Sequence, residues 1–541
     1  MHVSMNSSYS NNVSLHSYLN RSSFPSFSLS SQFQKRILGR SLARTWDRVK
    51  VLGDNKDYGH AGCVNALHWA RGGELLLSAG DDTTVQIWRL DSTNTSEDYP
   101  FVCRTVIHTG HNANIFNTAM LPYSDRIVTV AGDSQVRVFD VGQHGASAVG
   151  QDARQEYRTV HSRPHTLRCH GDRVKRIATE ESPNQFLTVS EDGTVRQHDL
   201  RTPHVCQSHC PAPLLQVHHE LSTLAVSSYY CVVAGDSPYG YLFDRRFTGR
   251  VLQHEWGAEG VVTCVRRFGR GNQRKGRRAY PREYVTGARM SADNGHEVLL
   301  SYSSDSVYLF STLYDPESSS PSSSSSIVPP NPKHRRLSLE SHSTSSSVSS
   351  SLLTEGTAMD IADLSADVEW EKEDEENVET PTEEEPRRFY PWVDVVKPLQ
   401  RFDGARNIDT VKDVNFLGPR DEYVASGSDD GNFFVWHKST GKLHGIYEGD
   451  SAVVNVIEGH PHLPLVAVSG IDHTVKLFAP VNCESAFSRI SNAESIIEVN
   501  RERSVIRTRI RTIRRYDLVS LLASVSGESN PEDATSDCVN Q

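Results

Sequence analysis

The sequence predicts an all-β fold, a seven-bladed β-propeller in which each blade is a four-stranded sheet. Three observations lead to this prediction. A unit of short runs that alternate apolar and polar residues recurs along the chain, each unit turns on Asp, Gly or Asn, and two residue spacings repeat inside the units. Seven such units lie between about residues 55 and 480, and seven blades close a ring.

The two spacings identify the polar residues of each unit. In three units a His precedes an Asp by 22 residues, and in five units an Asp precedes a ring-bearing residue by six. We expect the His, a strand Ser and the Asp to hydrogen-bond beneath the ring, because a buried polar set is tolerated only when every member has a partner. The expected members are His60, Ser78, Asp82, Trp88, His111, Asp133, His170, Asp192, Asp430, Trp436 and Asp472.

This pattern resembles the WD40 family, whose members form β-propellers. Residues 55–311 are expected to form blades one to five, and residues 389–480 blades six and seven. Between them, residues 312–388 begin with Ser runs and end in an acidic tract, so a disordered insertion that joins blades five and six is predicted.

The segments that flank the repeats have different compositions. Residues 1–31 are rich in Ser and Asn, which favours a disordered tail over an organelle transit peptide. Apolar residues in 32–52 recur near helical periodicity, so an amphipathic helix is expected there. Residues 481–541 are expected to hold a basic helix, over 501–522, and a tail.

Composition excludes several classes of function. The net charge is −11, of which −9 lies in residues 369–385, so the folded part is close to neutral and binding of nucleic acid is not expected. No apolar run is long enough to span a membrane, and nine scattered cysteines suggest reduced thiols inside a cell. Catalytic signatures are missing as well. We therefore expect a non-enzymatic protein without a cofactor, located in the nucleus, the cytoplasm or both.

Two neighbouring units end in a shared motif, a ring residue followed by Asp-x-Arg. His198 precedes Asp199 and Arg201, and Phe243 precedes Asp244 and Arg246. Four other units lack the motif. Arg suits a protein interface because its planar fork makes several directed hydrogen bonds and loses its hydration more readily than Lys.

Paired motifs of this kind are similar to those of the substrate receptors of cullin-four RING ubiquitin ligases. The resemblance includes a subgroup of adaptor-associated factors typified by the nuclear receptor interaction protein, and it is tightest in blades one, six and seven. It implies that Asp199, Arg201, Asp244 and Arg246 bind the adaptor, damaged-DNA-binding protein one. It also implies that the chain presents an unknown protein substrate while other subunits transfer ubiquitin. The sequence departs from the family at His198, where Trp or Tyr is preferred.

Alternatives remain open. The 32–52 helix inserts into a groove of the adaptor or folds back on the propeller. The chain could instead be a nuclear scaffold or transcriptional cofactor that acts through 312–388, or an RNA-associated propeller that uses the cations of 266–278. "KHRRLS" (333–338) fits an import signal and a phosphorylation site, and 501–522 could bind an acidic partner.

One cluster contains ligand types that zinc accepts. "HVCQSHC" holds His204, Cys206, His209 and Cys210, but this spacing matches no zinc pattern. Ordinary loop residues, and no metal site, are therefore expected.

Overall fold

A computed structural model describes most of the repeat region. The described residues are 31–54, 59–91, 94, 97–141, 155–157, 164–206, 210–247, 264–270, 284–316, 390 and 393–504. The predictions for residues 1–30, for 271–278 of the basic loop, for 317–388 of the insertion and for 505–541 concern residues outside these ranges. The chain divides into two compact units, residues 320–384 and the remainder, and only the second contains described residues.

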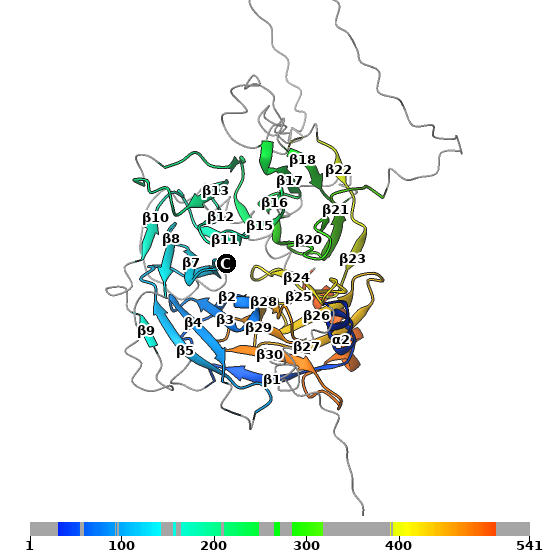
Figure 1. The fold of residues 1–541 in the computed structure, drawn as a ribbon. Coiled ribbons are helices and arrows are strands. Elements are labelled where there is room, and N and C mark those ends of the chain that lie inside the picture. Colours follow the sequence, from blue (N-terminus) through cyan, green and yellow to red (C-terminus); the bar gives the residue numbers. More distant parts are fainter. Residues whose placement is uncertain are drawn as a thin grey trace, which may run out of the picture. The chain divides into compact units, whose positions relative to one another are not determined.

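Seven β-sheets are arranged in a ring, as Figure 1 shows. The strands are as follows. Blade one has β2 (Val64–Ala70), β3 (Leu75–Gly80), β4 (Thr84–Leu90), β5 (Phe101–His108) and β9 (Gln155–Tyr157). Blade two has β6 (Ile115–Met120), β7 (Arg126–Ala131), β8 (Val136–Asp140) and β10 (His165–Leu167). Blade three has β11 (Val174–Thr179), β12 (Gln185–Ser190), β13 (Thr194–Asp199) and β14 (Leu215–Gln216).

The other blades follow the same order. Blade four has β15 (Leu221–Ser227), β16 (Tyr230–Gly235), β17 (Gly240–Asp244), β18 (Cys264–Phe268) and β22 (Val395–Val396). Blade five has β19 (Val285–Met290), β20 (Glu297–Tyr302), β21 (Val307–Ser311) and β23 (Gln400–Phe402). Blade six has β24 (Val414–Leu417), β25 (Tyr423–Gly427), β26 (Asn432–His437) and β27 (Leu443–Glu448). Blade seven has β28 (Val454–Gly459), β29 (Val466–Gly470), β30 (Val475–Pro480) and β1 (Trp46–Leu52). Short 3-10 helices are η1 (Arg71–Gly73), η2 (Arg245–Phe247) and η3 (Ile490–Asn492).

The ring is closed. The first strand of every blade contacts the first strand of the next, and β28 contacts β2. Residues of all seven first strands line one central cavity of about 280 Å³. Apolar side chains of adjacent sheets pack against each other, as Leu77 of blade one and Ile115 of blade two do within one buried cluster. The predicted seven-bladed all-β fold is confirmed.

The N-terminal segment differs from the prediction of one helix over 32–52. Helix α2 covers Ser31–Leu42, and the chain then enters β1, which pairs antiparallel with β30 and becomes the outer strand of blade seven. Trp46 and Leu52 are buried at the two ends of β1. Several apolar residues assigned to a helical face therefore belong to a strand, and this strand joins the start of the ring to its last blade.

Helix α2 lies on the propeller itself. Leu38 and Leu42, one turn apart, are buried in a cluster with Leu417 and Tyr423 of blade six and Phe478 of blade seven. This part of the helix folds back on the ring, which was one of the two alternatives that the sequence left open.

The insertion interrupts a blade instead of joining two blades. β21 is the third strand of blade five, and its outer partner β23 follows the insertion. β22, also from this later segment, adds a parallel strand to blade four. The predicted boundary at 389 therefore places in blades six and seven a segment that completes blade five.

The C-terminal helix begins earlier than predicted. Residues 493–504 are helical, and Ile496 and Ile497 pack against the core of blade six. Asn500 donates hydrogen bonds to the carbonyl oxygen of Gly404 and to Asp430. No helix in the described ranges is both long and apolar enough to cross a membrane.

Candidate functional site

Blade one contains the polar set expected from the repeat spacing. His60 Nδ1 lies 2.9 Å from Asp82 Oδ2, and His60 Nε2 lies 2.7 Å from the Ser78 hydroxyl. Trp88 Nε1 donates to the same hydroxyl at 2.8 Å. Burial alone would raise the pKa of Asp82, but the hydrogen bond and the charge of His60 lower it. The set fixes the loop before β2 against the β3–β4 turn.

Blades two and three repeat this arrangement with Thr in place of Ser. His111 contacts Asp133 at 3.0 Å and the Thr129 hydroxyl at 2.9 Å. His170 contacts Asp192 at 3.1 Å and the Thr188 hydroxyl at 2.7 Å.

His198 completes the set of blade three. Its Nε2 lies 2.8 Å from the Thr188 hydroxyl, and its ring stacks on Phe186. Burial lowers the pKa of His198 to about 3, so the ring is neutral at physiological pH. The residue that departs from the family pattern thus occupies the position that Trp88 has in blade one.

Blades six and seven hold their turns differently. Trp436 donates to the carbonyl oxygen of Asp403 at 3.1 Å, whereas Asp430 accepts from Asn500. The expected contact of Asp430 beneath Trp436 is therefore replaced by a contact with the C-terminal helix. In blade seven Lys476 pairs with both Asp450 and Asp472. Blades six and seven thus keep the Asp-to-ring spacing of blades one to three, but their Asp residues have different hydrogen-bond partners.

The first Asp-x-Arg motif lies at the end of β13. Asp199 is the last residue of this strand, and its carboxylate accepts the Arg201 backbone N–H at 3.0 Å, Nε at 2.9 Å and Nη2 at 2.6 Å. These hydrogen bonds hold the pKa of Asp199 well below its usual range. The Arg201 side chain is nevertheless 62% exposed.

The second motif repeats this geometry at the end of β17. Asp244 accepts the Arg246 backbone N–H at 3.0 Å, Nε at 2.9 Å and Nη2 at 2.5 Å. The Arg246 guanidinium lies 4.5 Å from the centre of the Tyr229 ring, and its side chain is 51% exposed. In both motifs the Asp carboxylate binds the Nε and Nη2 edge of the guanidinium, an arrangement that we call the clamp. The Nη1 group therefore faces away from the carboxylate. We call these four residues the Asp-x-Arg pair.

Both motifs lie at the same edge of adjacent blades. Asp199 also accepts a hydrogen bond from Gln185, the first residue of β12, at 2.8 Å. Arg245, inside the second motif, forms an ion pair with Glu180, in the turn that leads to β12. This ion pair joins the end of blade four to blade three, so the two motifs lie on directly contacting blades.

Helix α2 lies on the same face of the ring. Lys35 lies 3.3 Å from Asp293, in the β19–β20 turn, and Gly39 packs beside Glu422, in the β24–β25 turn. These turns correspond to the β11–β12 turn that contains Glu180, because each connects the first and second strands of a blade. One face thus has α2 over blades five to seven and the Asp-x-Arg pair on blades three and four.

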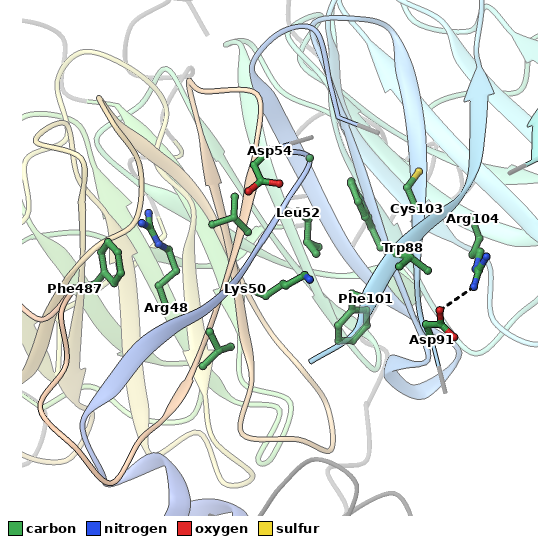
Figure 2. Close-up of a pocket in the computed structure, with 14 residues that line it drawn as sticks. Arg48, Lys50, Leu52, Asp54, Trp88, Asp91, Phe101, Cys103, Arg104 and Phe487 are labelled. Atoms are coloured by element: carbon green, nitrogen blue, oxygen red, sulfur yellow. Dashed lines mark hydrogen bonds and ion pairs between the residues drawn. The ribbon is translucent and has the colours of Figure 1, made fainter. Parts of the chain in front are cut away.

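A separate hollow of about 800 Å³ lies on the rim between β1 and β5. Figure 2 shows its charged side chains, among them Arg48 and Lys50, and the contact of Arg104 with Asp91 at 3.3 Å. No residue of the Asp-x-Arg pair lines it.

The structure also brings together residues that were expected to be ordinary loop residues. His204, Cys206 and Cys210 meet Cys169, and one ligand atom from each lies within 4.8 Å of the others. Burial and the neighbouring thiols raise the pKa of Cys169. His209 lies outside the described residues. The repeat spacing does not link Cys169 to this cluster, because Cys169 lies 35 residues before His204.

Comparisons with known proteins agree with the repeat architecture. Residues 53–89, 162–199 and 396–437 match the WD40 family described as "WD domain, G-beta repeat". The chain is similar to "WD repeat protein iqw1" of Schizosaccharomyces pombe, with 35% identity over 47% of this chain and 31% of that protein. It is also similar to "Protein ALTERED SEED GERMINATION 2" of Arabidopsis thaliana, with 32% identity over 46% and 34% respectively.

A third relative is "DDB1- and CUL4-associated factor 6" of Mus musculus, with 30% identity over 46% of this chain and 26% of that protein. The matched regions span about a third or less of the length of these curated relatives.

Proposed function

We propose that this WD40-repeat β-propeller is a substrate receptor of a cullin-four RING ubiquitin ligase that docks on damaged-DNA-binding protein one through the Asp-x-Arg pair. One observation carries the proposal: Arg201 and Arg246 have the same clamped geometry, remain exposed and lie at one edge of adjacent blades. A relative whose name associates it with DDB1 and CUL4 supports the same partner. Such a receptor would act in the nucleus, the cytoplasm or both.

The clamp explains why Asp precedes Arg by two residues. An unrestrained Arg loses conformational entropy when a partner immobilises it. Here the carboxylate of Asp199 or Asp244 already fixes the guanidinium in a planar, two-point contact. The free edge is therefore oriented for carbonyl or carboxylate acceptors of a partner. The receptor would supply proximity and orientation, and other subunits the chemistry.

The alternative of RNA binding has less support. Among the described cations of 266–278, Arg267 donates to the carbonyl oxygen of Val393 at 2.8 Å and Arg270 pairs with Asp305. These two guanidinium groups are thus engaged inside the protein. The alternative of a scaffold that acts through the insertion concerns residues outside the described ranges.

The test is the double substitution of Arg201→Ala and Arg246→Ala. Loss of one Arg that contributes strongly to an interface costs about 2 kcal/mol or more, so even if only one of the two Arg residues does so, the affinity for the purified adaptor should fall by at least about 30-fold. Surface plasmon resonance would measure this affinity, and the melting temperature should stay close to that of the wild type because both side chains are exposed.

Arg401→Ala is the matched control. Arg401 is 54% exposed and pairs with Asp403, two residues away, but it lies on the outer strand of blade five. Its substitution should leave the affinity for the adaptor unchanged. Wild-type affinity in the folded double variant would exclude this docking mode.

A further inference from the structure

Four ligand-type side chains converge beside the first Asp-x-Arg motif. Cys169 follows β10 at the entry to blade three, and His204, Cys206 and Cys210 lie in the connection between β13 and β14. Cys169 is buried, and the other two cysteines are partly exposed. Two segments far apart in the sequence therefore bring three sulfur atoms and one imidazole to a single point.

The distances among Cys169, His204 and Cys206 are close to those around one tetrahedral metal ion, and the Cys210 ligand atom lies within 4.8 Å of the other three. Cys169 Sγ lies 3.8 Å from Cys206 Sγ, and His204 Nε2 lies 3.1 Å and 3.4 Å from these two sulfur atoms. Zinc–ligand bonds of about 2.3 Å to sulfur and about 2.0 Å to nitrogen predict tetrahedral edges of about 3.8 Å between two sulfur atoms and about 3.5 Å between sulfur and nitrogen. A small rearrangement would bring the imidazole into position.

The donor chemistry selects the metal. Three thiolates and one imidazole form a Cys3His set, which is typical of structural zinc. Cys206 and Cys210 are separated by three residues, within the range of ligand pairs in such sites. The backbone N–H of Arg168 donates to Cys206 Sγ at 3.2 Å, a hydrogen bond that would stabilise a metal-bound thiolate.

We propose that Cys169, His204, Cys206 and Cys210 bind one structural zinc ion. On binding, Zn²⁺ displaces the thiol protons of the three cysteines, and the neutral imidazole of His204 contributes the lone pair of Nε2. All four positions are then occupied by protein, so the ion holds no water for catalysis.

The ion would cross-link two segments of blade three. The outer strand β14 has only two residues, so few backbone hydrogen bonds hold the β13–β14 connection. His204 lies three residues after Arg201, and zinc would anchor this connection to the start of the blade. The proposed metal site is independent of the proposed function. The number of zinc ions bound per chain can be measured without the adaptor, so either proposal can fail alone.

The test uses the full chain, purified without a metal-affinity tag. Inductively coupled plasma mass spectrometry should find about one zinc ion per chain. Cys206→Ser with Cys210→Ser should reduce this to a background level, whereas Cys483→Ser, at an exposed free cysteine, should not change it. His204→Cys supplies a fourth thiolate and should retain zinc.

Metal removal provides a second measurement if the double variant does not fold. Stripping the wild-type chain with a chelator should lower its melting temperature, and stoichiometric zinc should restore it. Cobalt in place of zinc should give the visible absorption of a tetrahedral thiolate complex. A folded wild-type chain without zinc, unchanged zinc in the double variant, or a disulfide at Cys169 in the purified protein would overturn the proposal.

Discussion

At the scale of single residues, His198 shows how one side chain can replace another in a buried network. Its ring stacks on Phe186, and its Nε2 contacts the Thr188 hydroxyl, which also contacts His170. Trp88 has the equivalent contact with Ser78 in blade one. Either side chain therefore meets the two requirements of this position, an aromatic ring that packs in the blade and a ring nitrogen that reaches the Ser or Thr hydroxyl.

His198→Phe separates these two contributions. The substitution retains an aromatic ring but removes the nitrogen that contacts Thr188, so we expect a loss of about 1–3 kcal/mol in the free energy of unfolding. His198→Ala also removes the stacking on Phe186 and should cost more. Urea unfolding followed by circular dichroism would measure both. Equal stability of His198→Phe and the wild type would show that the hydrogen bond contributes little.

At the scale of elements, β1 attaches the N-terminal segment to the last blade of the ring. It pairs with β30 over its whole length, and Trp46 is completely buried against blade six. The Trp46 ring stacks on Tyr447, with centroids 5.5 Å apart, and its Nε1 donates to the carbonyl oxygen of Leu42. The helix and the strand are thus joined through one residue.

Trp46→Ala should therefore weaken the attachment of the N-terminal segment to blades six and seven. Removal of a fully buried Trp side chain commonly costs about 3–5 kcal/mol. We expect a decrease of this size in the free energy of unfolding, measured with denaturant, and a smaller decrease for Trp46→Phe, which keeps a stacking partner for Tyr447. A loss below about 1 kcal/mol for Trp46→Ala would contradict this role of β1.

At the scale of the whole molecule, the ring tolerates a long insertion within one sheet. β21 and β23 pair although the insertion separates them in sequence. The entropic cost of closing a loop grows only slowly with its length, so this pairing costs little more than it would with a short loop. The closed ring then depends on all seven blades together.

The stability of the ring should depend on pH. Burial lowers the pKa of His198 to about 3 and that of His460 to about 4. Both are neutral in the folded protein, but in the unfolded chain they bind protons below about pH 6.5. Their contribution to stability is complete above this pH and is lost as the pH falls toward the folded-state values, by up to about 1.4 kcal/mol per pH unit for each proton.

Denaturant unfolding at a series of pH values would measure this effect. The free energy of unfolding should decrease between about pH 6.5 and 4.5. His198→Phe removes one of these buried histidines and should make the decrease shallower. A constant or rising stability over this range would contradict the burial of neutral histidines.

The sequence by itself determined the blades of the ring and the Asp-x-Arg pair. Repeat spacing marks the turn residues and the third strand of each blade. The Asp-x-Arg motifs, Asp199–Arg201 and Asp244–Arg246, each span only three residues, so their geometry follows from the local sequence. The spacing gave no information on partners from distant segments. It therefore predicted neither the pairing of Asp430 with Asn500 nor the strand character of Trp46.

Only the tertiary structure decided which distant segments meet. β1 joins blade seven, β23 completes blade five, and Cys169 reaches His204. The physical reason is the same in each case. An outer strand pairs with whichever strand edge still has free backbone N–H and C=O groups, and a ligand side chain joins whichever cluster lies beside it. The folded ring decides which groups lie close, whatever their separation along the chain.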